Sequence, residues 1–202
     1  MRNAYALLGI MFTIVFVGVY LSSRTAEAPT FLISDNQTDK MSFLLSSPAF
    51  EPNAFIPKKY SCDGLNVSPP FVLSGAPAAT KSFVLVMDDP DIPQEIKEQR
   101  GIEKFNHWAV YNIPPDTIEI PEGAGLGASG KNGRGEMSYT GPCPPTEYEP
   151  TTHRYIFRLY ALSSSLDFDS IPSLDEVEAA AQSKMLDKTE LIGRYSRVDT
   201  VN

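Results

Sequence analysis

The chain has 202 residues, of which 42% are apolar, and a formal net charge of −8 at pH 7. This length suits one globular domain with a short appendage, and the apolar content is sufficient for a packed core. The acidic balance argues against non-specific binding of nucleic acid, and it requires that any anionic ligand be captured by a local group of positive side chains. The 13 glycines and 17 prolines favour strands and turns over a helical bundle.

The first 28 residues predict a targeting or anchoring segment. Arg2 precedes an uncharged apolar run over residues 4–21, which is long enough to cross a bilayer as a helix. Residues 26–28, Ala-Glu-Ala, have the pattern of a signal-peptidase site. Pro29 directly after this site would hinder cleavage, so an uncleaved membrane anchor is slightly favoured over a signal peptide. We therefore expect export, with the protein anchored in the membrane or, after cleavage, periplasmic or extracellular.

The exported part is expected to be a polar linker over residues 29–40 and a single domain over residues 41–199. The domain contains both cysteines, Cys62 and Cys143, which do not form a CxxC pair, so a structural zinc site is not expected. An oxidising compartment would permit a disulfide between them. Two separate buried thiols are the more usual alternative.

Three segments predict β-strands because they are rich in β-branched and aromatic residues: 81–89, 107–113 and 153–162. Strand alternation places every second side chain on one face. In the first segment this face contains Phe83, Leu85, Met87 and Asp89. In the second it contains His107, Ala109 and Tyr111. In the third it contains His153, Tyr155, Phe157 and Leu159, with Arg154 and Arg158 on the opposite face.

Helices are expected at two places only. Ser173 is a candidate N-cap and Glu176 completes a capping box, which predicts a helix from there to about residue 186. A weaker helical stretch covers residues 94–100, and residues 190–195 are expected to return as a strand. Several strands with one or two helices indicate a mostly β domain, with an antiparallel sheet and helices at its edge.

The side chains best suited to binding or catalysis lie at the ends of the predicted strands. The only two histidines, His107 and His153, begin strands, and Asp89 ends one. We expect the three to border one shallow cleft; the other interpretation is that each is a satisfied structural polar group. Prolines stiffen the turn after Asp89, and the Gly141–Pro145 segment is similarly stiff. In that segment the backbone amides of Gly141 and Cys143 would be free to donate to an anion.

Several stretches of the sequence resemble the phosphatidylethanolamine-binding protein family over about residues 41–199. They are LVMDDPDIP (85–93), NHWAVYNIP (106–114) and YTGPCPP followed by THRYIFRLYAL (139–162). SCDGLNVSPP (61–70) and GKNG (130–133) resemble its bacterial and archaeal Raf-kinase-inhibitor-like branch. The chain departs from the family pattern at Asn106, often His in eukaryotic members, and at Gly133, often Asp in bacterial members.

The resemblance implies a large antiparallel sheet packed on a smaller sheet with a few flanking helices. It also implies a pocket for phosphate or phosphoethanolamine-like groups, with no cofactor and no metal. By motif, the ligand-binding residues would be Asp89, His107, Gly141, Pro144, Pro145, His153 and Tyr155, none of them catalytic. Phosphate would accept hydrogen bonds from the imidazoles and the Tyr155 hydroxyl, while Asp89 would hold a histidine tautomer or accept from an ammonium group.

The expected function is therefore non-catalytic binding of a phosphorylated or zwitterionic small ligand, in a regulatory role. A possible homodimer is left open. One alternative, also suggested by the family, is an exported inhibitor of a protease or kinase. Another is a hydrolase or metal-dependent enzyme using Asp89, His107 and His153, although no GxSxG elbow is present.

Overall fold

The structure is a computed structural model, which describes residues 42–197. The predicted anchor (1–28) and linker (29–40) lie outside these described residues. Within the described range, no helix combines the length and apolarity that a membrane span requires.

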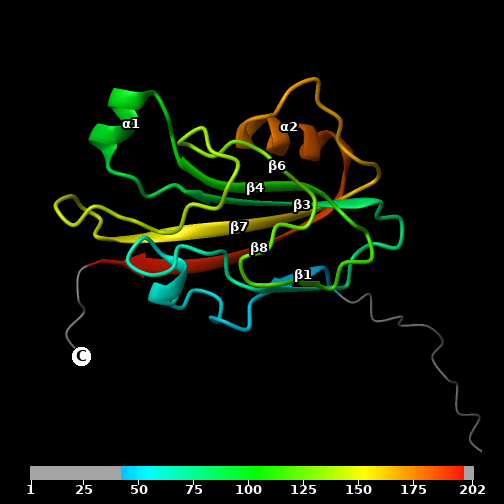
Figure 1. The fold of residues 1–202 in the computed structure, drawn as a ribbon, viewed down its shortest axis with the longest axis horizontal. Coiled ribbons are helices and arrows are strands. Elements are labelled where there is room, and N and C mark those ends of the chain that lie inside the picture. Colours follow the sequence, from blue (N-terminus) through cyan, green and yellow to red (C-terminus); the bar gives the residue numbers. More distant parts are fainter. Residues whose placement is uncertain (1–41, 198–202) are drawn as a thin grey trace, which may run out of the picture. The chain divides into compact units, whose positions relative to one another are not determined.

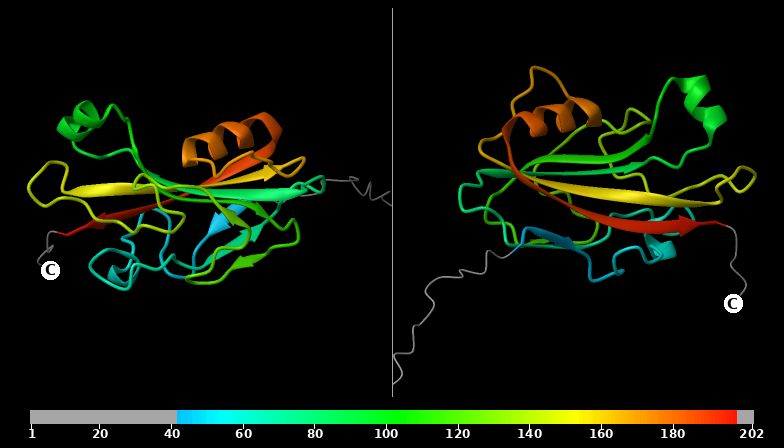
Figure 2. Two further views of the ribbon diagram at one scale, coloured as in Figure 1. Left: turned by 45° about the horizontal axis from the view of Figure 1, so that its top comes forward. Right: turned by 180° about the vertical axis from the view of Figure 1, so that it is seen from behind.

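Two antiparallel sheets form the domain, and a helix covers the outer face of the larger one (Figures 1 and 2). The larger sheet has the strand order β6-β4-β3-β7-β8, and the smaller has the order β1-β2-β5. The large-sheet strands are β3 (Ser82–Asp89), β4 (Phe105–Ile113), β6 (Ala128–Ser129), β7 (Thr152–Leu162) and β8 (Met185–Ser196). The small-sheet strands are β1 (Leu44–Ser46), β2 (Phe71–Ser74) and β5 (Glu119–Ile120). The helical elements are η1 (Lys58–Tyr60), α1 (Gln94–Arg100) and α2 (Leu174–Lys184). The predicted mostly β class and two-sheet architecture are confirmed.

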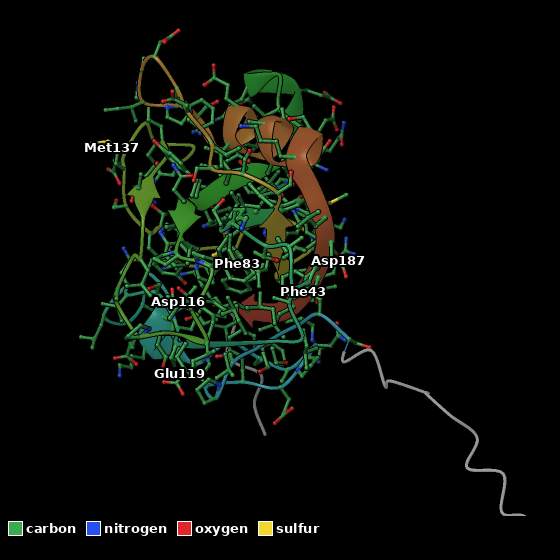
Figure 3. The ribbon with its side chains drawn as sticks, turned by 90° about the vertical axis from the view of Figure 1, so that its right-hand side faces the viewer. Phe43, Phe83, Asp116, Glu119, Met137 and Asp187 are labelled. Carbon is green, nitrogen blue, oxygen red and sulfur yellow. A yellow bond between two sulfur atoms is a disulfide. The ribbon has the colours of Figure 1, made fainter. Side chains whose placement is uncertain are left out.

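The main core lies between the two sheets and is largely aromatic. The face predicted for β3 and β7 supplies much of it, with Phe83, Leu85, Met87, Tyr155, Phe157 and Leu159 all buried. Phe71 of the small sheet contacts Phe157 of the large sheet, with ring centroids 5.0 Å apart. Phe43, labelled with Phe83 in Figure 3, stacks on it at 6.0 Å. Burial of these rings supplies the main driving force for pairing the sheets.

A second core lies between the large sheet and α2. Val84 and Val86 of β3 pack there against Leu174, Val177 and Ala181 of the helix. Because both faces of β3 are covered, all eight of its residues are buried and no polar alternation shows in its sequence.

The structure confirms the capping box at the start of α2. The Ser173 hydroxyl accepts a hydrogen bond from the Glu176 backbone N–H, and the Glu176 carboxylate accepts one from the Ser173 backbone N–H. The helix ends at Lys184, two residues before the expected end, because the chain enters β8 at Met185. The weaker helix over 94–100 is present as α1.

The prediction that His107, Ala109 and Tyr111 share one face is wrong. Opposite β3, the partner of Met87 is Trp108, whereas the partner of Asp88 is Asn106, so His107 is an extra residue in β4. Such a bulge resets the alternation of the strand. Ala109 and Tyr111 pack toward α2, whereas His107 lies on the other face of the sheet, with its ring 5.2 Å from that of Tyr155.

The segment before η1 crosses β8 at Gly193, where there is no room for a side chain. The backbone N–H of Ile56 donates to the Arg194 carbonyl, and a Cβ on Gly193 would lie 2.5 Å from Cγ1 of Ile56. We expect Gly193→Ala to lower the free energy of unfolding by about 1–3 kcal/mol through overpacking, measured by urea denaturation. The control is Gly125→Ala, where the nearest heavy atom, Cγ2 of Val110, would be 3.9 Å away. Equal stability of the two variants would contradict this prediction.

Candidate functional site

A cavity of about 270 Å³ opens at the end of the large sheet where β3 finishes and β7 begins. In Figure 1 this is the end at which α1 stands. Its walls are residues 141–145, α1 with the turn before it, and the β4 end of the sheet. The lining residues are Asp89, Ile92, Pro93, Ile96, Arg100, Phe105, His107, Arg134, Thr140, Gly141, Cys143, Pro144, Pro145 and His153. The structure thus brings six of the seven predicted site residues to one cavity, all except Tyr155.

Asp89 and His153 form a buried hydrogen-bonded pair in the wall of the cavity. The Nδ1 atom of His153 lies 2.6 Å from Oδ2 of Asp89, and both side chains are less than 5% exposed. The other carboxylate oxygen of Asp89 accepts the backbone N–H of Asp91 at 2.8 Å. With Nδ1 donating to the carboxylate, the remaining ring nitrogen, Nε2, is buried and has no hydrogen-bond partner among the described residues. A buried polar atom without a partner is costly, so this nitrogen is poised for a ligand.

His107 is oriented by the backbone instead of by a carboxylate. Its Nδ1 lies 2.6 Å from the Thr140 carbonyl oxygen, which can only accept, so Nδ1 carries the proton. Burial lowers the pKa of His107, against the opposing effects of the Thr140 carbonyl and of Asp89. At neutral pH the ring is therefore neutral, and its Nε2 is an acceptor until a proton binds there.

The wall formed by residues 141–145 is held from outside the cavity. The backbone N–H of Gly141 donates to the Asn66 side chain at 2.8 Å, and a disulfide joins Cys143 to Cys62, with 5.4 Å between their Cα atoms. The expectation that the Gly141 amide is free for an anion is therefore wrong, because the Asn66 carbonyl occupies it. The sequence left open whether Cys62 and Cys143 form a disulfide or remain separate thiols, and the structure shows the disulfide.

Tyr155 lies behind the cavity wall. It is fully buried, and its ring contacts those of His107 and His153 at centroid distances of 5.2 and 6.4 Å. Its hydroxyl makes no hydrogen bond of normal geometry within residues 42–197, although the Cys143 backbone N–H is close enough to act on its pKa. Burial nevertheless raises the pKa of Tyr155 well above its usual range. In this structure Tyr155 packs against the two imidazole rings. A ligand would have to reach between these rings to contact it.

Sequence reasoning missed both basic residues of the lining and several apolar ones. Arg100 and Ile96 come from α1, and their spacing of four residues places them on one helix face, a signal that the sequence contained. Arg134 comes from the glycine-rich segment, where no periodicity marks it. Phe105 and Ile92 are further apolar residues of the wall.

The charge on the cavity lining is opposite to that of the whole chain. Asp89 is the sole carboxylate among the lining residues, and two arginines, Arg100 and Arg134, accompany it. These two arginines and one carboxylate together contribute a charge of +1 to the lining, in a chain of net charge −8. Within residues 42–197, no group of three or more His, Cys, Asp or Glu side chains is arranged to hold a metal ion. The arrangement suits capture of a small anion.

The fold is that of a known family. The family model described as phosphatidylethanolamine-binding protein matches residues 46–196. The chain belongs to the phosphatidylethanolamine-binding protein family.

Relatives of the chain occur in bacteria and archaea. A UPF0098 protein of Methanothermobacter thermautotrophicus is 38% identical over 160 residues, covering 76% of this chain and 98% of the relative. A UPF0098 protein of Aquifex aeolicus is 40% identical over 159 residues, covering 75% and 86%. Two solved structures are similar: the phosphatidylethanolamine-binding protein homologue CT736 of Chlamydia trachomatis and YbcL of E. coli. They are 36% and 27% identical, with TM-scores of 0.70 and 0.67; they cover 77% and 76% of this chain, and 98% of each neighbour is covered.

The lowered pKa of His107 makes domain stability depend on pH. Because the folded-state pKa lies below the unfolded value of about 6.5, the unfolded chain takes up the proton first, and stability falls as pH drops through that value. We expect urea denaturation to show a loss between pH 7.5 and 5.5 of at most about 1.4 kcal/mol per pH unit from this group. His107→Gln keeps a donor for the Thr140 carbonyl and should show a smaller loss. Equal losses in the two proteins would argue against a neutral, buried His107.

Proposed function

We propose that the domain binds a small phosphate-bearing anion in this cavity, without catalysing a reaction, and serves a regulatory role. The observation that carries the proposal is the buried Nε2 of His153, which has no hydrogen-bond partner among the described residues, in a ring that lines the same cavity as His107. Two imidazole edges at one cavity, each fixed by a bond from its Nδ1, form a pre-organised pair of contacts for phosphate oxygens. The positive lining supplies the local attraction that an acidic chain needs.

Protons are part of the proposed binding event. Both Nδ1 atoms are engaged inside the protein, so each Nε2 offers a lone pair when its ring is neutral. A phosphate oxygen can then be bound in two ways: the ring takes up a proton and donates it, or the ligand arrives as a monoanion and donates its own hydroxyl. In both cases the complex contains one proton shared between the Nε2 atom and the phosphate oxygen.

We also propose that the domain is exported. The disulfide between Cys62 and Cys143 supports this, because such bonds persist in oxidising compartments and are rare in the cytosol. It ties the pocket wall to the loop at residues 61–66, so the proposed ligand site would depend on that environment.

The direct test is calorimetric titration of the domain with inorganic phosphate. We expect binding by the wild type at pH 6.5, and at least tenfold weaker binding by His107→Gln, because the glutamine amide can reach the Thr140 carbonyl but offers nothing in place of Nε2. The matched control is Lys81→Gln, an exposed change at the opposite end of β3, which should bind as the wild type does. A wild-type domain that binds neither phosphate nor simple phosphomonoesters would refute the proposal.

The pH dependence of the same titration tests the proton count. Since one proton is taken up or carried in, we expect phosphate affinity to fall by up to about tenfold per pH unit as pH rises from 6.5 to 8.5. The fall in phosphate affinity per pH unit should be smaller in His107→Gln. An affinity that stays constant from mildly acidic to alkaline pH would show that no proton is shared between the imidazoles and the ligand.

A further inference from the structure

The two arginines of the cavity differ from the other arginines of the domain. Residues 42–197 contain six arginines. Three of them form ion pairs with carboxylates: Arg154 with Asp91, Arg158 with Asp88, and Arg197 with Asp63. A fourth, Arg194, donates to the Asn53 carbonyl and stacks on Phe55. The guanidinium groups of the remaining two, Arg100 and Arg134, make no ion pair or side-chain hydrogen bond with any described residue, and both line the cavity.

Unpaired arginines are notable in a chain with 25 acidic and 17 basic side chains. Acidic partners for a surface guanidinium are plentiful in such a protein. That both unpaired groups border one cavity means that this cavity has two bidentate donors with no internal acceptor.

Both arginines are mounted on ordered backbone. Arg100 is the last residue of α1, which Gly101 terminates in the left-handed conformation at a φ of 64°. The backbone N–H of Arg134 donates to the side-chain oxygen of Asn132, a residue that is only 5% exposed. The same asparagine donates to the Thr140 hydroxyl, next to the carbonyl that orients His107. Each arginine therefore projects from a segment of ordered backbone that borders the cavity.

The cavity has more room than a phosphate requires. Its volume of about 270 Å³ corresponds to about nine water molecules at ~30 Å³ each. A phosphate with five heavy atoms at the imidazoles leaves space for a further group of similar size, flanked by the apolar side chains of Ile92, Ile96 and Phe105.

A cationic group would be poorly matched to this space. Asp89, the carboxylate of the lining, already accepts from His153 and from the backbone of Asp91. An ammonium group on the ligand would meet two guanidinium charges and no free carboxylate among the lining residues, and like charges in one site select against such a ligand.

We propose that Arg100 and Arg134 form a second anion subsite, so that the ligand is a small phosphomonoester with a second anionic group, a carboxylate or another phosphate. This inference rests on the proposed phosphate site. It makes the two arginines specificity-determining residues that discriminate against zwitterionic phosphoethanolamine.

The test compares three phosphomonoesters that differ only beyond the phosphate: phosphoglycolate, ethyl phosphate and phosphoethanolamine. Calorimetric titration of the wild-type domain at pH 6.5 should give affinities in that descending order, with at least a tenfold difference between the first and the last. Arg100→Gln and Arg134→Gln should each lower the ratio of phosphoglycolate to ethyl phosphate affinity about fivefold, a reduced effect because both side chains are exposed.

The control for loss of one positive charge is Lys81→Gln. Lys81 directly precedes β3 and lies eight residues from Asp89, about 26 Å away at ~3.3 Å per residue, so its substitution should leave the affinity ratio unchanged.

The outcomes separate this inference from the proposed function. If neither inorganic phosphate nor ethyl phosphate binds, the phosphate site itself is wrong. If both bind but phosphoethanolamine binds as tightly as phosphoglycolate, the phosphate site stands and the second subsite is refuted. An affinity ratio that is the same in wild type and both arginine variants refutes it equally.

Discussion

Strand β3 ends in two consecutive buried carboxylates. The need to give each of them a positively charged or hydrogen-bonding partner constrains how the rest of the domain packs. Because adjacent residues of a strand point to opposite faces, Asp88 and Asp89 need separate partners. Asp88 is paired with Lys104 and Arg158 on the α2 side, and Asp89 with His153 on the other side. A buried carboxylate without such a partner would cost several kcal/mol. The α2 side therefore stabilises the scaffold, while the opposite side leaves an imidazole nitrogen available at a cavity.

The bulge in β4 makes the site possible. A regular strand would have turned His107 toward α2 with Ala109. The extra residue opposite Met87 and Asp88 turns it toward Tyr155 and the cavity instead, where the Thr140 carbonyl fixes its tautomer. Bulges commonly re-aim a side chain near a functional site. As a result, two imidazoles line the same cavity, one hydrogen-bonded to a carboxylate and the other to a backbone carbonyl.

Membership of the phosphatidylethanolamine-binding protein family accounts for the fold. The protein is acidic as a whole and basic at this cavity, so attraction of an anion depends on a few local groups and weakens steeply with distance and salt. Arg100 and Arg134 supply that charge, while the imidazoles supply directional contacts whose proton content depends on pH.

The sequence by itself determined the elements with local signals. The capping box at Ser173 predicted α2, strand alternation predicted the buried faces of β3 and β7, and family motifs pointed to six residues that line the cavity. Tertiary structure decided the rest. The face of His107 depends on pairing with β3, the partner of the Gly141 amide comes from a loop 75 residues away, and the disulfide spans 81 residues. Local sequence encodes φ/ψ preference and periodicity. Register, long-range hydrogen bonds and the placement of Arg100 and Arg134 at one cavity exist only after distant segments have packed together.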